Sequence, residues 1–174
     1  YQQEYKRGIP VAPVKKIGSV SDNETGTEHR FLPDKEIFSE TDFDFKEVVK
    51  NCRQHAYLTA GLRISITDER VEEGSNPKIF NLYFEDGIKS YVLFMNLDEK
   101  PINEEPFYVK KESDEMVVEA AIQYTDSMDE SVKCYTNNII NPEGGTHLSG
   151  FRTALTSAIN TYAQKADLLK GLTD

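Results

Sequence analysis

The apolar residues of this chain follow two different spacings, and the chain changes from one to the other several times. From residue 41 or 42 to about residue 60, they recur at three- and four-residue intervals, the spacing of an amphipathic helix. The stretches LRISITDER and KIFNLYFED instead alternate apolar and polar residues, which is typical of two strands in a hairpin. The chain is therefore expected to combine helices with sheets. The apolar helix positions are Phe45, Val48, Val49, Cys52 and Ala56.

Similar patterns continue on both sides of these segments. Residues 13–20 and 25–32 are predicted to form two short strands joined by a polar turn. At Asp86 and Gly87 a second unit is expected to begin, because IKSYVLFMNL has helical spacing and a long amphipathic helix is predicted from Leu148 onward. Between these helices, three stretches are rich in strand-forming residues: FYVKKES, MVVEAAIQYTDS and SVKCYTNNI. This order of elements predicts an α/β (α+β) fold.

The length of 174 residues allows one or two domains. The net charge of −10 disfavours nonspecific binding to nucleic acid, so a DNA contact would need a local basic patch. No apolar run approaches the roughly 20 residues that span a bilayer, and the start, YQQEYKRG, has no signal-peptide pattern. Since the chain also lacks an initiator methionine, we expect a piece of a longer cytoplasmic protein with no membrane partner.

The cysteines and histidines do not have the spacing of a metal site. Cys52 and Cys134 lie far apart with no C-x-x-C pair, and we expect reduced, buried thiols. His29, His55 and His147 form no H-E-x-x-H or related ligand pattern. No metal site is predicted.

The stretch NPEGGTHLSGFR has two interpretations. Gly144 and Gly145 can turn the chain into a helix, with the Thr146 hydroxyl as the N-cap. Alternatively, the same helix start can bind an anion beside Thr146 and His147, because the first N–H groups of a helix have no intrahelical partner. The residues alone leave both interpretations open.

Motifs of complete nucleotide sites and hydrolases are missing. Glu47 and Asn51 have the E-x-x-x-N spacing of a water-activating glutamate and a metal-binding asparagine, but no D-x-G-x-G or G-x-x-G follows them, so a solvated helix face is favoured. Phosphate-binding G-x-x-x-x-G-K-[ST] and G-x-G-x-x-G sequences and the hydrolase motif G-x-S-x-G do not occur. The segment TGT suggests a tight strand entry in which Gly26 takes a conformation that other residues resist.

Taken in order, several stretches resemble the B-subunit family of bacterial DNA gyrase, and the resemblance covers essentially the whole chain. They are YKRGIPVAPV, ETGTEHRFLPD, EIFSETDFDF, HAYLTAGLRISITDER, YFEDGIKSYV, CYTNNIINPEGGTHLSGFRTALT and NTYAQK. The combination NNI…EGGTHL-x-GF-x-x-AL-T is specific, and the closely similar subunit of topoisomerase IV shares these motifs.

The resemblance implies two domains. Residues 1–86 would be the C-terminal part of a GHKL (Bergerat) ATPase sandwich, and residues 87–174 the N-terminal part of a transducer domain with a ribosomal-protein-like β-α-β fold. In the family, ATP and Mg²⁺ close a homodimeric clamp on DNA, hydrolysis resets it, and the gyrase A protein is the partner. The implied function is that of an ATP-dependent type II DNA topoisomerase, which introduces negative supercoils.

The family's catalytic glutamate, magnesium-binding asparagine and adenine-binding aspartate would lie before residue 1, and its phosphate-sensing lysine beyond residue 174, so no catalytic residue is expected here. Thr27, with Thr25 and Gly26 beside it, matches the threonine that supports the adenine-binding aspartate. Arg152 matches a position that faces the DNA-sized hole of the clamp. GGTHL matches a transducer loop and helix start, so capping is favoured.

By itself the chain is expected neither to hydrolyse ATP nor to hold a cofactor. Three other functions stay open at this point: a non-catalytic interaction module of the same fold, a topoisomerase IV subunit with decatenating activity, and a small anion-binding protein that uses GGTHL.

Overall fold

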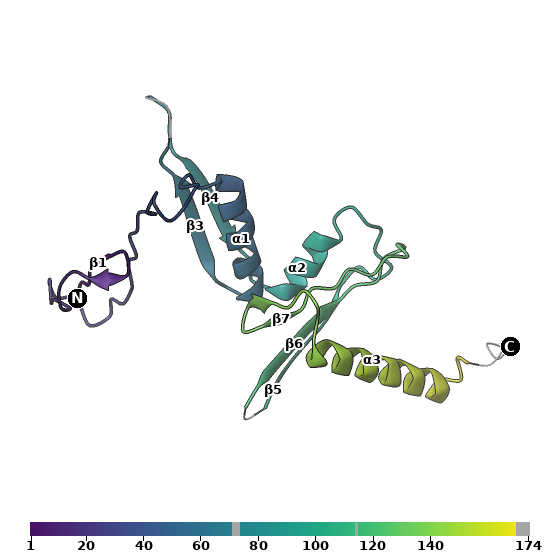
Figure 1. Cartoon of the computed structure of the whole chain (residues 1–174). Coiled ribbons are helices and arrows are strands. Elements are labelled where there is room, and N and C mark those ends of the chain that lie inside the picture. Colours follow the sequence, from purple (N-terminus) through teal and green to yellow (C-terminus); the bar gives the residue numbers. More distant parts are fainter. Residues whose placement is uncertain (71–73, 114, 170–174) are drawn as a thin grey trace. The chain divides into compact units, whose positions relative to one another are not determined.

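The computed structural model describes residues 1–70, 74–113 and 115–169 (Figure 1). The chain divides into two compact units, Tyr1–Asp44 and Phe45–Asp174. This division lies before the predicted domain boundary at residues 86 and 87, which stays a prediction.

The first unit is built around a short hairpin. Strands β1 (Tyr5–Lys6) and β2 (Ile9–Pro10) pair antiparallel, with Tyr5 opposite Pro10. Arg7 and Gly8 between them both have positive φ, at 52° and 78°, as a two-residue type I′ turn requires. The guanidinium of Arg7 also pairs with the carboxylates of Asp34 and Glu36. A local turn and ion pairs therefore organise this unit.

The strands predicted at residues 13–20 and 25–32 are wrong. In these ranges only Lys15 makes a β-bridge, with Gln2, and the other residues lie outside helices and strands. No residue of the first unit is buried, so its alternating side chains have no apolar layer to pack against. An alternating pattern alone does not specify a strand, because a strand also needs a partner with which to pair.

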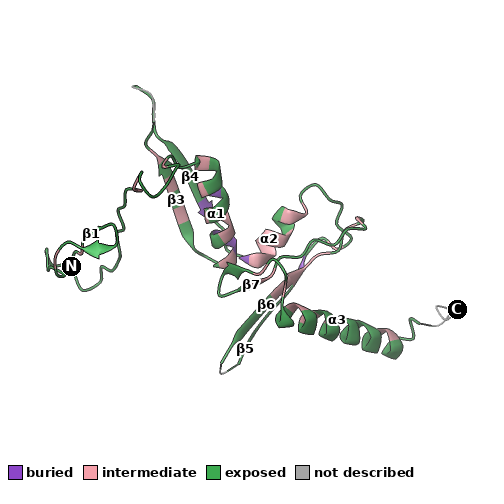
Figure 2. Ribbon diagram, in the orientation of Figure 1, coloured by how far each residue is buried: buried purple, intermediate pink, exposed green. Residues whose placement is uncertain are grey.

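The second unit begins with a helix over a hairpin, as predicted. Helix α1 (Phe45–Leu58) contacts both β3 (Arg63–Asp68) and β4 (Lys78–Tyr83). The two strands pair antiparallel, with Ile64 opposite Leu82. Figure 2 shows buried positions along α1 and the adjoining strand. In the described part of the chain, the buried hydrophobic residues are Val49, Ala56, Tyr57 and Leu82.

A second helix and hairpin follow. Helix α2 (Ile88–Met95) contacts β6 (Val117–Ile122), which pairs antiparallel with β5 (Phe107–Glu112). Just beyond these elements, the Asn96 amide donates a hydrogen bond of 3.0 Å to the side-chain oxygen of Gln123. The second half of β6 is half-buried, whereas every residue of β5 is exposed. This helix and both strands were predicted, and they are confirmed.

A hydrogen bond across this hairpin predicts a pH effect. The Tyr108 hydroxyl donates to the Glu119 carboxylate at 2.8 Å; desolvation first, and then this bond, raise the pKa of Tyr108 to about 12. The folded chain keeps this proton at pH values where the unfolded chain has lost it, so stability should fall as pH rises from about 10 to about 12. Glu119→Gln should lower the pKa of Tyr108 in a phenolate absorbance titration, with Glu112→Gln as the control. Equal titration curves for the two variants would contradict this assignment.

The stretch SVKCYTNNI forms a tight hairpin and not the predicted single strand. Strand β7 (Tyr135–Thr136) pairs with β8 (Ile139–Ile140). Between them, Asn137 and Asn138 have φ values of 49° and 64°. Asparagine is one of the few residues that enter the left-handed region readily, so Asn-Asn supports the two-residue turn.

The last described element is helix α3 (Thr146–Lys165). It begins two residues before the expected Leu148. Of its apolar side chains, Leu148, Phe151 and Leu155 are half-buried, whereas Ile159 and Tyr162 are 49% and 67% exposed. Among the described helices, none has the length and apolar character that crossing a membrane requires. The predicted mixed α/β fold class is confirmed, since the described residues combine helices with short antiparallel sheets.

Candidate functional site

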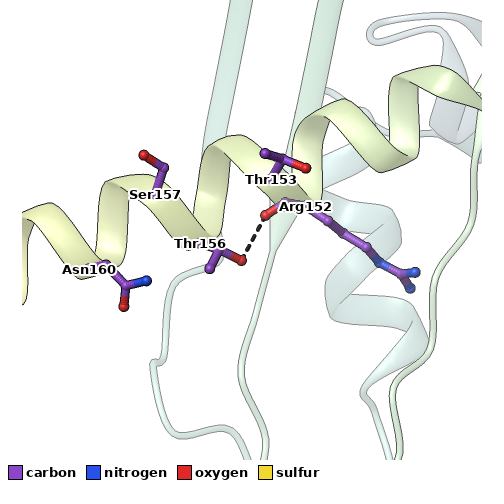
Figure 3. Close-up of a pocket in the computed structure, with 5 residues that line it drawn as sticks. All are labelled: Arg152, Thr153, Thr156, Ser157 and Asn160. Atoms are coloured by element: carbon purple, nitrogen blue, oxygen red, sulfur yellow. Dashed lines mark hydrogen bonds between the residues drawn. The ribbon is translucent and has the colours of Figure 1, made fainter.

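A row of polar side chains on α3 lines a shallow groove of about 460 Å³. Figure 3 shows the five residues along the helix. Spacings of four positions place residues 152, 156 and 160 in one row along the helix and residues 153 and 157 in the adjoining row. The five residues are Arg152, Thr153, Thr156, Ser157 and Asn160.

Arg152 is the basic residue of this groove, and it is already paired. Its Nη2 lies 2.7 Å from Oε2 of Glu130, in the loop before β7. The two side chains are 51% and 68% exposed, and ion pairs at such exposure contribute only about 0 to 1 kcal/mol. Glu130 therefore holds the Arg152 side chain only weakly. The sequence did not reveal this pair, because the two residues are 22 positions apart in a loop and a helix.

The hydroxyl groups of the two threonines in the groove already donate hydrogen bonds to carbonyl groups of the same helix. Thr156 donates to the carbonyl of Arg152 at 2.9 Å, as Figure 3 shows, and Thr153 donates to the carbonyl of Ser149 at 2.9 Å. Such bonds one turn back are common for helical threonines. The donors of the groove that can face an anion are thus Arg152, Ser157 and Asn160.

The TGT segment is exposed. Thr25, Gly26 and Thr27 lie outside helices and strands in the first unit. The expected special conformation of Gly26 is wrong: its φ is not in the left-handed region, and an added Cβ would meet no atom within 4 Å. The described residues also contain no group of three or more His, Cys, Asp or Glu side chains that could hold a metal.

The GGTHL segment starts α3, but not through the predicted cap. Gly145 occupies the N-cap position without a side-chain hydrogen bond, and Thr146 is already helical, so Thr146 as N-cap is wrong. Gly144 has a φ of 73°, and a Cβ there would lie 2.8 Å from Cδ2 of Leu148. Backbone geometry and this close approach thus require glycine at residue 144.

Two other expectations concern the surface of α1 and the thiols. Glu47 and Asn51 are exposed, and the Glu47 carboxylate pairs with Lys50 at 3.2 Å, so the solvated helix face is confirmed. Cys52 and Cys134 are free, as expected, but they are half-buried and not fully buried.

Comparisons with known proteins identify the family. The family model described as DNA gyrase B matches residues 87–173, half of the chain. The DNA gyrase B subunit of Bacillus mycoides is 42% identical over 171 residues, which cover 98% of this chain and 41% of that protein. The chain belongs to the DNA gyrase B family. The gyrase B protein from Staphylococcus aureus is 39% identical over 171 residues, with 26% of its length covered.

Solved structures agree with this family assignment. The 43K ATPase domain of Thermus thermophilus gyrase B, solved with an aminocoumarin, superposes with a TM-score of 0.79 and 31% identity over 95% of this chain and 44% of that one. The gyrase B protein of Myxococcus xanthus shares the fold, with a TM-score of 0.73 and 20% identity over 93% of this chain and 46% of that one. The chain thus spans less than half of each of these four gyrase B proteins.

Proposed function

We propose that this chain acts within a longer DNA gyrase B polypeptide, where residues 1–86 end the ATPase domain and residues 87–174 begin the transducer. The observation that carries this proposal is the continuous similarity of 98% of the chain to a DNA gyrase B protein at 42% identity. The similarity to a gyrase B ATPase-domain structure supports it. The whole enzyme then uses ATP to introduce negative supercoils, as a cytoplasmic partner of gyrase A.

In this proposal the chain supplies scaffold and DNA contact and no catalytic residue. Thr27, with Thr25 and Gly26, contributes one wall of the adenine pocket once the upstream residues are present. ATP and Mg²⁺ supply the phosphoryl-transfer chemistry in the complete enzyme, in which two ATPase domains pair to close the clamp. The residues after Gly87 relay clamp movement toward DNA, a coupling between sites that depends on the movement of one body against another.

Arg152 contacts the phosphate backbone of the captured DNA in this proposal. The support is its position in a polar groove of α3, with an exposed guanidinium and a weak partner. Guanidinium groups bind phosphate through paired N–H donors and position DNA without reading its sequence.

The proposal is tested with the complete polypeptide and its gyrase A partner. Relaxed plasmid and catenated DNA are each incubated with ATP. ATP-dependent negative supercoiling supports the gyrase assignment, and decatenation without supercoiling would assign the topoisomerase IV alternative. A polypeptide that changes neither substrate, yet is folded, would favour the non-catalytic interaction module.

Neutralising either partner of the Arg152–Glu130 ion pair should change DNA-stimulated ATP turnover, in opposite directions for the two variants. Arg152→Gln should weaken DNA-stimulated ATP turnover in the complete enzyme and reduce the slope of log affinity against log salt by about one, because one phosphate contact is lost. Glu130→Gln should strengthen stimulation, since it frees the guanidinium. DNA affinity and DNA-stimulated ATP turnover are both measured over a salt series.

The matched control is Lys165→Gln, which removes one positive charge from the last turn of the same helix. It should leave the salt slope unchanged. If Arg152→Gln and Lys165→Gln behave alike, or if Arg152→Gln leaves both stimulation and supercoiling intact, Arg152 is not a DNA contact.

A further inference from the structure

The ring of Tyr57 stacks on aromatic residues that lie on both sides of Gly87 in the sequence. It lies near the end of α1, is only 4% exposed, and stacks on Phe84 with ring centroids 3.7 Å apart and planes 22° from parallel. On the other side of Gly87 in the sequence, the ring of Tyr91 in α2 lies 4.8 Å from Tyr57 at an interplanar angle of 6°. Phe94, one turn further along α2, lies 5.6 Å from it. We call these four residues the aromatic junction.

The backbone at Gly87 is packed tightly against the end of α1. Gly87 has a φ of 52°, and a Cβ there would lie 3.0 Å from the Cβ of Ala60 and 3.3 Å from the carbonyl oxygen of Tyr57. The Phe84 carbonyl accepts hydrogen bonds from the N–H groups of Gly61 at 3.0 Å and Gly87 at 3.4 Å. The passage into α2 is thus held by packing and hydrogen bonds, unlike a flexible linker.

The junction also reaches the β7–β8 hairpin. The hydroxyl oxygens of Tyr91 and Tyr135 lie 3.3 Å apart, within hydrogen-bonding distance, and Tyr135 begins β7. In the turn of the same hairpin, the Asn138 amide donates to the Thr59 hydroxyl at 3.3 Å, 79 residues away in the sequence. Two separate contacts therefore connect this hairpin with α2 and with the end of α1.

A cationic side chain extends the junction toward β4. The Arg53 guanidinium, one turn before Tyr57 on α1, lies 5.3 Å from the ring centroid of Phe94 and 5.8 Å from that of Phe80. Cation–π contacts at these distances are attractive. One turn of α1 thus contacts β4 on one side and α2 on the other through aromatic rings.

We infer that Tyr57 is a positioning residue for energy coupling: its ring holds α2 against the end of α1 through Phe84, Tyr91 and Phe94, so that movement before Gly87 is passed to the DNA-facing part after it. This inference rests on the proposed function. Energetic coupling can be carried by contiguous packed side chains, and the rings of the aromatic junction are packed in contact on both sides of Gly87 in the sequence.

The experiment compares Tyr57→Leu with Tyr57→Phe in the complete polypeptide with gyrase A. Leucine keeps an apolar side chain at the buried position but removes the stacking face, whereas phenylalanine keeps the ring. ATP turnover and supercoils introduced per ATP are measured together. Tyr57→Leu should keep ATP turnover but lower supercoils per ATP by between about twofold and thirtyfold, the range by which coupling-path mutations act. Tyr57→Phe should restore the wild-type ratio.

A second variant keeps the test decisive if Tyr57→Leu does not fold. Phe84→Leu removes the ring that stacks on Tyr57 at a half-buried site, and Phe84→Tyr keeps an aromatic ring there. Unchanged supercoils per ATP in the folded leucine variants, or equal losses in the leucine variants and the variants that keep a ring, would overturn the inference. Loss of supercoiling by the wild-type enzyme would instead overturn the proposed function, so the two failures are distinguishable.

Discussion

Replacing Tyr57 by alanine is expected to lower the free energy of unfolding of the second unit by about 3 to 5 kcal/mol, the cost of truncating a buried aromatic side chain. Tyr57 is 4% exposed and contacts three other rings. The buried hydrophobic set of the described residues has only four members, so few other contacts compensate for the lost ring. Urea unfolding followed by far-ultraviolet circular dichroism measures the loss.

The matched control is Tyr162→Ala on α3, where the side chain is 67% exposed. Substitutions at such surface positions change stability by about 0.5 kcal/mol or less. If the two alanine variants lose the same stability, the second unit is not held together at Tyr57. The proposed role of the aromatic junction in coupling would then lose its structural basis as well.

The second large effect concerns ATP. The 174-residue chain is expected to show no ATP hydrolysis above the blank, because general base, metal ligand and preorganised phosphate donors contribute most of the acceleration in phosphoryl transfer. A polypeptide extended upstream through the family's E-x-x-x-N and D-x-G-x-G motifs should bind a nonhydrolysable ATP analogue with Mg²⁺ in calorimetry and hydrolyse ATP.

The comparison is made between the two polypeptides under one set of conditions. Within the extended polypeptide, Thr27→Val should weaken analogue binding, whereas the same change at Thr161, on α3, should not. Binding or turnover by the 174-residue chain alone would reveal a nucleotide site other than the one proposed, and GGTHL would be the first segment to examine.

The parts of the fold that were predictable from the sequence are those in which a local pattern meets a neighbouring partner. The spacing of Val49 and Ala56 marks the buried face of α1, and the alternation of Ile64 and Ile66 marks the inner face of β3. Because β3 pairs with the next strand along the chain, one hairpin gives the pattern its covered face. Strand β5 likewise pairs with the next strand, β6, and α2 contacts β6.

Other features depend on information that periodicity does not contain. Residues 13–20 and 25–32 alternate, but apart from the bridge of Lys15 to Gln2 they pair with no strand in the first unit. The sequence pattern places Asn137 and Asn138 inside a strand, because periodicity does not reveal that both residues adopt the left-handed conformation of a turn. Glu130 could not be matched to Arg152, because a loop residue reaches a helix only through the tertiary fold. The roles of Thr27 and Arg152 come from family resemblance and stay predictions.

The pairing of adjacent strands has a consequence for how the chain acquires its structure. In the described ranges, each sheet joins two strands that follow one another in sequence. Contacts of such short sequence separation close quickly, so these hairpins can form while the chain is still leaving the ribosome. The bond between Asn138 and Thr59 spans 79 residues and can close only after the β7–β8 turn has been synthesised. The rings of Tyr57, Phe84 and Tyr91 can therefore pack together before the Asn138–Thr59 hydrogen bond forms.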